Sequence, residues 1–568
     1  MDTQRLILFM LFTFSSFFLI DAWQKDAHPP VTVPASSVPK GTPSATPVPS
    51  ATQPSAAQPS AVAPSASAPV TSGDLQKGEQ IRVQTDRFIA VIDTAGGDLR
   101  HLELLGQRDT LDKTKNFALL ELQPARTYIA QAGLIGKDPQ GKELPNHRTL
   151  YTASEREVKL GDGAAEVAVR LTATTPAGVK VTKIYTFHRN SYVIDVSYEI
   201  DNKSAAPFQA DGYFQLVRDG NPPVGDSAML PTYTGIAVYS DKEKFQKVAF
   251  SDVDKNKVSY LKKTNDGWIA ILQHYFLSAW LPANNTPREF YTRRLDNGLY
   301  AAGVILPIGT VEPGASAALK VPLYVGPQEG ENLANLAPGL DLTIDYGWLT
   351  ILAKPLFWYL QWLYHWVGNW GVAIILLTVT LKAVFYPLSA ASYRSMARMR
   401  VLAPRLQKLK DQYGNDRQRM NQAMMELYKT EEINPLGGCL PVLVQIPVFI
   451  ALYWVLLASV ELRHAPFMLW IDDLSRPDTL FGVWFGMPIG LLPILMGATM
   501  IFQTYLNPEP PDPVQAKIMK IMPIAFSVMF FFFPAGLVLY WLVNNILSIA
   551  QQWQITRAME HPKPAHGK

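Results

Sequence analysis

The chain has 568 residues, of which 17% are charged, and its formal net charge is +3. This length predicts more than one domain, and so small a net charge argues against DNA or another nucleic acid as the main partner, because such binding needs a concentrated basic face. A single cysteine, Cys439, excludes an intramolecular disulfide. The mean hydropathy of +0.04 averages a charged first half with a second half that contains long uncharged runs.

The first 78 residues contain an apolar run and then a low-complexity stretch. In residues 1–21 an uncharged, mostly apolar run follows Arg5, and no A-x-A cleavage pattern comes after it. This pattern predicts an uncleaved signal-anchor transmembrane helix with its N-terminus inside the cell, and a cleaved signal peptide is the alternative. Residues 22–78 are rich in Pro, Ala and Ser. Such a composition cannot build a core and predicts a disordered tether.

Residues 79–343 alternate apolar and polar side chains over short runs. Examples are Ile81–Asp93, Ala165–Thr174 and Ser191–Asp201, which are separated by turns containing Gly, Asn or Asp. This alternation predicts half-buried strands, and a succession of them predicts an all-β sandwich. The histidines of this region are scattered, with no metal-ligand spacing and no nucleophile elbow. We therefore expect no catalytic residue, no metal and no cofactor, and we do not expect an enzyme.

Residues 344–370 are rich in Trp and Tyr, and their leucines recur at helical spacing. An amphipathic helix of this composition is typical of the headgroup layer of a membrane. Pro355 predicts a break or a start within the helix, because proline lacks the amide hydrogen that a helix interior uses. The alternative is a helix that packs on the β-domain.

Residues 371–388 form an apolar run that contains one charge, Lys382. Its length predicts the second transmembrane helix, yet a charge at the centre of a bilayer costs about 2.5–3.5 kcal/mol. Such a residue usually faces the interior of a helix bundle or a watery cavity, so Lys382 predicts a polar pocket inside a membrane protein. Snorkelling of the lysine to the membrane surface is the alternative.

Residues 389–439 are strongly basic, and Met and Leu recur in them at spacings of three and four on both sides of Gly414. The excess of Lys and Arg predicts a cytoplasmic loop, which places both termini inside and the β-domain outside. The spacing predicts an antiparallel helical hairpin. Its methionines are interpreted either as a thin core of the hairpin or as an adaptable surface for apolar partners, with the basic face as a site for ribosomal RNA or anionic lipid.

Further apolar runs lie in residues 440–556, at Leu440–Val460, Leu480–Leu506, Ile518–Phe533 and Ala535–Ala550. They predict transmembrane helices three to six, so that six are expected in all. The last two runs are short and are separated by Pro534 alone, which predicts a tight hairpin. Residues 557–568 then form a short cytoplasmic tail.

Several long motifs follow one another in the chain. They are KAVFYPL (Lys382–Leu388), NPLGGCLPVLVQIPVF (Asn434–Phe449), SVELRHAPFMLWIDDLS (Ser459–Ser475), LPILMGATM (Leu492–Met500), KIMKIMP (Lys517–Pro523), FPAGLVLYW (Phe533–Trp541) and, in the β-patterned half, DGWIAILQHYFLSAWLP (Asp266–Pro282). With these motifs the chain resembles the YidC/Oxa family of membrane protein insertases, and in particular its Gram-negative members. The likeness is dense from Tyr346 to about Arg557 and looser from Ile81 to Leu340.

The resemblance implies an α-helical polytopic membrane protein of the Gram-negative inner membrane, with six transmembrane helices and a large extracytoplasmic all-β sandwich domain in the periplasm. It implies a five-helix core around a hydrophilic groove, open to cytoplasm and lipid, that inserts nascent inner-membrane proteins and helps them fold. The implied partners are these nascent proteins, the ribosome, the Sec translocon with its accessory subunits, and membrane lipids. The implied groove residues are Lys382, Thr378, Gln445, Phe449, Met496, Tyr540 and Trp541, with Tyr386 and Tyr393 at the cytoplasmic mouth.

Two positions depart from the pattern of the family. Lys382 stands where the family most often has Arg, so the charge is kept but the planar fork that can hold a carboxylate at two points is lost. Trp541 stands where Tyr is commoner. The residues alone leave two other functions open. One is a secondary transporter or channel with Lys382 as the ion site, although the later runs contain no Asp or Glu. The other is a membrane-anchored sugar-binding or cell-wall enzyme, which would rest on the β-sandwich.

Overall fold

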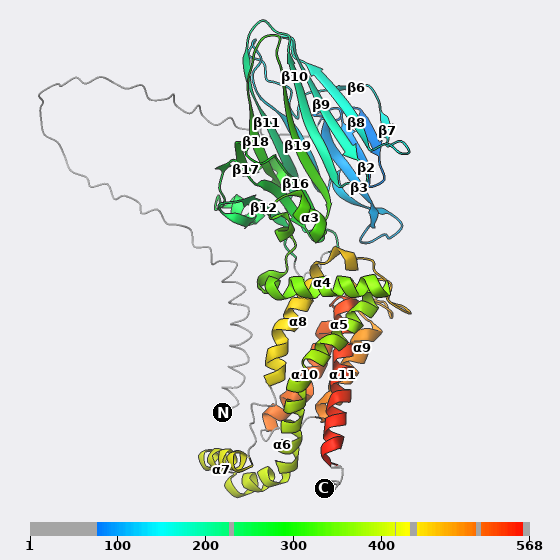
Figure 1. The fold of residues 1–568 in the computed structure, drawn as a ribbon, viewed down its shortest axis with the longest axis vertical. Helices are drawn as coiled ribbons and strands as arrows, with labels where there is room; N and C mark the ends of the chain where they lie inside the picture. Colours follow the sequence, from blue (N-terminus) through cyan, green and yellow to red (C-terminus); the bar gives the residue numbers. More distant parts are fainter. Residues whose placement is uncertain (1–75, 226–231, 415, 432–439, 507–512, 561–568) are drawn as a thin grey trace, which may run out of the picture. The chain divides into compact units, whose positions relative to one another are not determined.

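The computed structural model describes residues 76–225, 232–414, 416–431, 440–506 and 513–560. These residues form a β-domain followed in the chain by a helical region (Figure 1). The expected signal anchor (1–21), nearly all of the tether (22–78) and most of the tail (557–568) lie outside the described residues.

The β-domain is built from two large sheets, in which neighbouring strands are antiparallel except for the parallel pair β1 and β7. The first sheet has the order β14 (Lys263–Thr264), β17 (Arg288–Arg294), β18 (Leu299–Val311), β11 (Phe208–Asp219), β5 (Arg126–Gly136), β4 (Asn116–Gln123), β3 (Asp98–Arg108), β2 (Phe88–Asp93), β1 (Gln80–Gln84) and β7 (Glu157–Lys159). The second has the order β13 (Lys244–Val248), β12 (Gly235–Ser240), β15 (Trp268–Gln273), β16 (Phe276–Trp280), β19 (Ser316–Pro327), β10 (Val193–Asn202), β9 (Val179–His188), β8 (Glu166–Thr174) and β6 (Thr152–Ala153).

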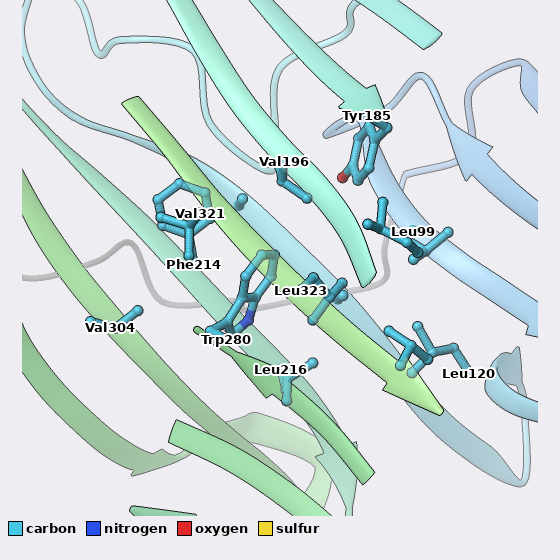
Figure 2. Packing of buried hydrophobic residues seen from close by; sticks show 14 of the residues in the cluster. Leu99, Leu120, Tyr185, Val196, Phe214, Leu216, Trp280, Val304, Val321 and Leu323 are labelled. Atoms are coloured by element: carbon cyan, nitrogen blue, oxygen red, sulfur yellow. The ribbon is translucent and has the colours of Figure 1, made fainter. Parts of the chain in front are cut away.

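The core of the β-domain contains alternate side chains from strands of both sheets. In β10, Ile194, Val196, Tyr198 and Ile200 are fully buried, and the residues between them are mostly polar. Figure 2 shows part of this core, in which Trp280 is among the largest fully buried side chains. Period-two alternation therefore did predict the β-domain, because each strand covers the core with one face only. Residues 79–343, the predicted extent, contain all of these strands.

The run Ile81–Asp93 forms two strands of a hairpin, β1 and β2, and the turn between them is specified by Thr85. Its Oγ1 accepts hydrogen bonds from the backbone amides of Arg87 (3.1 Å) and Phe88 (3.0 Å). A threonine hydroxyl that bonds the following backbone in this way is a common device for starting a turn. The two strands then pair in antiparallel register, with Val83 opposite Ala90.

The helical region follows short helices in and after the β-domain, which are α2 (Phe250–Asp254) and α3 (Gly330–Leu336). Its own helices are α4 (Thr350–Val367), α5 (Trp370–Val384), α6 (Tyr386–Tyr413), α7 (Arg417–Thr430), α8 (Leu440–Ala458), α9 (Leu491–Leu506), α10 (Pro513–Phe530) and α11 (Ala535–Glu560) (Figure 1). The sixth apolar run is thus part of a helix that continues past Ala550, because the polar residues beyond it, such as Gln551, Gln552 and Arg557, are good helix formers.

Helix α4 is amphipathic and continues through Pro355. Ala353, Phe357, Leu360 and Leu363 lie buried on one face, whereas Trp358, Trp362 and Trp366 are exposed. The helix is not broken at Pro355, although this proline is its sixth residue and removes one backbone hydrogen bond.

Helix α5 ends just before Phe385 and helix α6 begins just after it, and the chain bends at this residue. Together, Trp370–Val384 and Tyr386–Met399 have the length and composition of a membrane span, with a bend of 66° between them. Among the described residues, no helix taken singly is both long enough and apolar enough to cross a membrane.

The apolar run Leu480–Leu506 is helical only in its second part, which corrects the expectation of one long helix. Val483–Trp484 (β20) and Met487–Pro488 (β21) form a small antiparallel hairpin, and α9 begins at Leu491. Glycines at positions 482, 486 and 490 and Pro488 explain the difference, since these residues disfavour a helix interior. Hydropathy alone cannot distinguish an apolar hairpin from an apolar helix.

Candidate functional site

Lys382 lies in the last turn of α5 and is in contact with α11. Its Nζ donates a hydrogen bond to Ser548 Oγ at 2.6 Å, and Ser548 Oγ donates in turn to the backbone carbonyl of Asn544 at 2.7 Å. Ser548 is almost fully buried, and Lys382 is half-buried. The ammonium is therefore held by a neutral hydroxyl.

The same face of α11 continues the polar contacts to α8. Gln445 Nε2 donates to Asn544 Oδ1 at 2.9 Å. Lys382, Ser548, Asn544 and Gln445 therefore form a connected set, which we call the polar seam. Hydrogen bonds between membrane helices contribute on average about 0.6 kcal/mol each, so the seam orders these side chains without holding the helices rigidly together.

Further polar contacts connect α11 to α9. Asn545 Nδ2 donates to Thr499 Oγ1 at 3.4 Å, and Gln552 Nε2 donates to the carbonyl of Leu506 at 3.1 Å. Ser548 was not among the sequence-predicted site residues. It lies four residues after Asn544, one helical turn away on the same face, and this spacing is the signal that could have identified it.

Three predicted groove residues form an aromatic group beside the seam. The Phe449 ring on α8 meets the Trp541 ring at 4.3 Å in an edge-to-face arrangement, and it lies 6.1 Å from the Tyr540 ring. Tyr540 is buried, whereas Phe449 and Trp541 are half-buried. Trp541 Nε1 is buried and has no hydrogen-bond acceptor among the described residues. An unpaired indole N–H of this kind can donate to a polar group that enters the bundle.

Thr378 and Met496 differ from the other predicted groove residues in that they are buried inside the helical region. The exposed fraction of Thr378 is 1%, and its Oγ1 donates to the carbonyl of Ile374 in its own helix at 2.7 Å. Met496 on α9 is fully buried. Both side chains pack among helices in this conformation, so a substrate would reach them only if the helices moved.

The two tyrosines expected at the cytoplasmic mouth are the first and the eighth residue of α6. Tyr386 is 44% exposed, and its carbonyl accepts from Gln551 Nε2 at 3.5 Å. Tyr393 is half-buried and interacts through its side chain with Ser548, the residue that binds Lys382. The start of α6 is thereby connected to the polar seam.

Helices α6 and α7 form the basic segment that was expected to be a hairpin. They pack against each other, and Arg405 of α6 pairs with Glu431 beyond α7, with 2.5 Å between Nη1 and Oε1. Leu402 is buried, whereas Val401 and Met425 are 75% and 61% exposed. Some apolar side chains of these two helices are therefore exposed on the surface.

The β-domain encloses a separate cluster of ionisable side chains between its sheets. Lys183 Nζ donates to the carbonyls of Ala132 (2.9 Å) and Gly96 (3.2 Å), and Gln131 Nε2 donates to Asp98 Oδ2 (2.8 Å). Burial raises the pKa of Asp98 to about 6 and lowers the pKa of Lys183 to about 8, and each charge partly offsets the effect on the other.

His147 in this cluster is kept neutral by burial, which lowers its pKa to about 4 with help from the nearby Arg148 charge. The Tyr213 hydroxyl accepts from the backbone amide of His147 at 3.1 Å and lies 2.5 Å from the ring Nδ1 of the same histidine. These groups affect how the stability of the β-domain depends on pH.

Comparison with known proteins assigns the chain to a family. Residues 80–359 match the family described as "YidC periplasmic domain", and residues 362–563 match "60Kd inner membrane protein". A relative named "Membrane protein insertase YidC" from Nitrosospira multiformis is 55% identical, with 99% of this chain and 98% of that protein covered. The chain belongs to the YidC family. This confirms the resemblance found in the sequence motifs.

A second relative and a solved structure are also similar to this chain. A relative of the same name from Methylobacillus flagellatus is 56% identical, again with 99% of this chain and 98% of that protein covered. A solved structure titled "Active YidC insertase crystal structure with the first transmembrane domain resolved" is 20% identical, with a TM-score of 0.37, 84% of this chain covered and 92% of that chain covered. As a member of the YidC family, the chain combines a periplasmic β-domain with a helical inner-membrane region.

Proposed function

We propose that this membrane protein insertase accepts the polar flank of a nascent segment at the polar seam, while the apolar part of the segment passes into lipid. The observation that carries the proposal is that no carboxylate among the described residues pairs with Lys382. Its ammonium donates to the neutral Ser548 hydroxyl, and α5, α8, α9 and α10 contain no Asp or Glu. The positive charge is therefore available to attract an acidic flank.

The apolar part of the substrate has a path beside the seam in this proposal. Phe449 and Trp541 are half-buried, so they can contact an apolar segment that slides between α8 and α10. The free Trp541 Nε1 can donate to a backbone carbonyl of the substrate that has not yet entered a helix. Burial of the substrate's apolar surface supplies about 25 cal/mol per Å², and the chain contains no phosphate-binding motif for ATP.

Short helices lower the barrier that a polar flank meets. Helix α9 has 16 residues, which at about 1.5 Å per residue is roughly 24 Å long, and this is less than the roughly 30 Å of a typical hydrocarbon layer. A bilayer that thins to match such a helix shortens the low-dielectric distance the flank must cross. The membrane potential adds to the driving force on charged flanks.

The helical hairpin of α6 and α7 is proposed to receive the segment first. Exposed apolar side chains such as Val401 and Met425 offer contacts to varied hydrophobic segments. The surrounding Lys and Arg suit the ribosome or anionic lipid as partners. We further propose that the six helices expected from the sequence span the inner membrane with both termini in the cytoplasm, and that some substrates arrive from the Sec translocon.

Site-specific photocrosslinking tests the proposal. A crosslinker at Gln445 or Trp541 should capture ribosome-bound chains of membrane proteins in reconstituted vesicles. The matched controls are the exposed neighbours Ile446 and Ile546, which are 43% and 49% exposed. Capture at the controls that equals or exceeds capture at Gln445 and Trp541 would mean that the substrate does not pass the polar seam.

A further inference from the structure

The segment between α8 and α9 carries two turns with exposed apolar tips. Leu469 is 92% exposed and its neighbour Met468 is 52% exposed. In the β20–β21 hairpin, Phe485 is fully exposed, and Val483 and Trp484 are 61% and 64% exposed. We call Met468–Leu469 and Val483–Phe485 the two apolar turns.

Both tips have a backbone conformation that suits a bulky residue badly. The φ angles of Leu469 and Phe485 are 57° and 52°, in the left-handed region, which costs a side-chain-bearing residue about 1–2 kcal/mol. Phe485 and Gly486 (φ 80°) form a two-residue hairpin loop in which Asn-Gly is strongly preferred. Of the other non-glycine residues with a positive φ in the described part of the chain, four are asparagine (Asn190, Asn256, Asn285 and Asn297), and the remaining three are Lys244, Tyr275 and His464.

The strain suggests that a large apolar side chain is needed at each tip. An asparagine would suit the turn better, so turn geometry does not explain Leu469 or Phe485. Backbone strain of this kind often marks a site with a function. Because the tips extend outward, that function lies in what they contact outside the chain.

The base of the segment is fixed by one buried carboxylate. Asp478 accepts hydrogen bonds from the backbone amides of Leu480 (3.1 Å) and Leu492 (2.8 Å) and from Trp470 Nε1 (3.2 Å). A side chain at Gly490 would begin 2.4 Å from Asp478 Cγ, so glycine is required there for this close approach. These bonds connect the first turn, the hairpin and the start of α9.

We propose that the two apolar turns insert into the interfacial layer of the lipid bilayer and anchor the segment that precedes α9. The hairpin ends three residues before the apolar helix α9 begins, and no charged residue occurs from Leu480 to Leu506. Trp is enriched at the boundary between headgroups and acyl chains, and Trp, Phe and Leu side chains are those that interfacial segments bury there. A protein partner is less suited to these tips, since protein interfaces surround an apolar centre with a polar rim.

The anchor rests on the membrane location of the family and not on the polar seam. It would fix the depth at which α9 enters the bilayer, because Asp478 connects the hairpin to the first turn of that helix. The apolar turns and the exposed tryptophans of α4 would then contact the membrane surface at two different places.

Fluorescence quenching tests the anchor in the full-length protein. In a Cys439→Ser background, Phe485→Cys or Leu469→Cys is labelled with an environment-sensitive dye and the protein is reconstituted into vesicles. Both residues are so exposed that the label displaces no packed side chain. The matched control is Leu150→Cys, which replaces a 68% exposed leucine of the β-domain.

The proposal expects both tip labels to be quenched several-fold more by a nitroxide near the top of the lipid acyl chains than the control label. It also expects them to be several-fold less accessible to aqueous iodide. Tip labels that iodide quenches as strongly as the control would overturn it. Labels shielded from iodide yet unaffected by the lipid nitroxide would also overturn it, because a second copy or another protein would then cover the tips.

Discussion

Replacing Lys382 by Met tests the role of the charge at the polar seam. Met keeps the length of the side chain and removes the ammonium that donates to Ser548. A substrate carboxylate about 6 Å from that ammonium, at an effective dielectric constant of about 20, would lose roughly 3 kcal/mol of attraction. This corresponds to a decrease in rate on the order of 100-fold if the attraction acts in the transition state.

The assay is insertion into vesicles by purified protein, with a single-span substrate whose short flank is either acidic or neutral. Lys382→Met should slow the acidic flank by up to about 100-fold and the neutral flank by only a few-fold. Lys382→Arg should retain activity with both flanks, and Lys382→Glu should impair the acidic flank most. Ser548→Ala is the matched control, because it removes the hydrogen-bond acceptor and keeps the charge. Equal slowing of both flanks by Lys382→Met would refute the reasoning.

Three further predictions concern stability. His147 has a folded-state pKa of about 4 against about 6.5 in the unfolded chain. The unfolded chain therefore binds a proton that the folded chain does not, and the free energy of unfolding falls by about 2 kcal/mol from pH 7 to pH 5. Denaturant titrations at both pH values should show this decrease in wild type and not in His147→Gln. Trp280→Ala should destabilise the β-domain by about 3–5 kcal/mol, which calorimetry checks against the exposed control Leu150→Ala. Asp478→Ala removes the hydrogen-bond acceptor of three donors and should lower the free energy of unfolding by about 3 kcal/mol or more. If the melting temperature of this variant in nanodiscs equals that of Asp478→Asn, the prediction is wrong.

The β-domain could be predicted from the sequence because its signal is local. In β10 every second residue is buried, and this period is visible without knowledge of the partners. The pairing of the strands could not be predicted. Strand β11 lies between β5 and β18, and the residues of β11 do not indicate which strands it pairs with.

The helical region shows where a hydropathy average fails. The run Leu480–Leu506 is uncharged throughout, yet its first part forms a hairpin. Gly486 next to Phe485 was a local sign of a turn, but a window that averages the run cannot register it. For the candidate site, the resemblance to the family indicated Lys382 and Gln445, whereas the contact of Lys382 with Ser548 depends on how α5 packs against α11.

The break at Phe385 has a consequence for the electrostatics of Lys382. Since α5 ends at Val384 and α6 bends away by 66°, Lys382 belongs to the last turn of α5, where the negative pole of the backbone dipole lies. A cation in this position gains about 0.3–1 kcal/mol, and up to about 2 kcal/mol when it is partly buried. The peptide groups of α5 can thus act as a diffuse counter-ion, which stabilises the lysine without an acidic side chain that would compete with the acidic flank of a substrate.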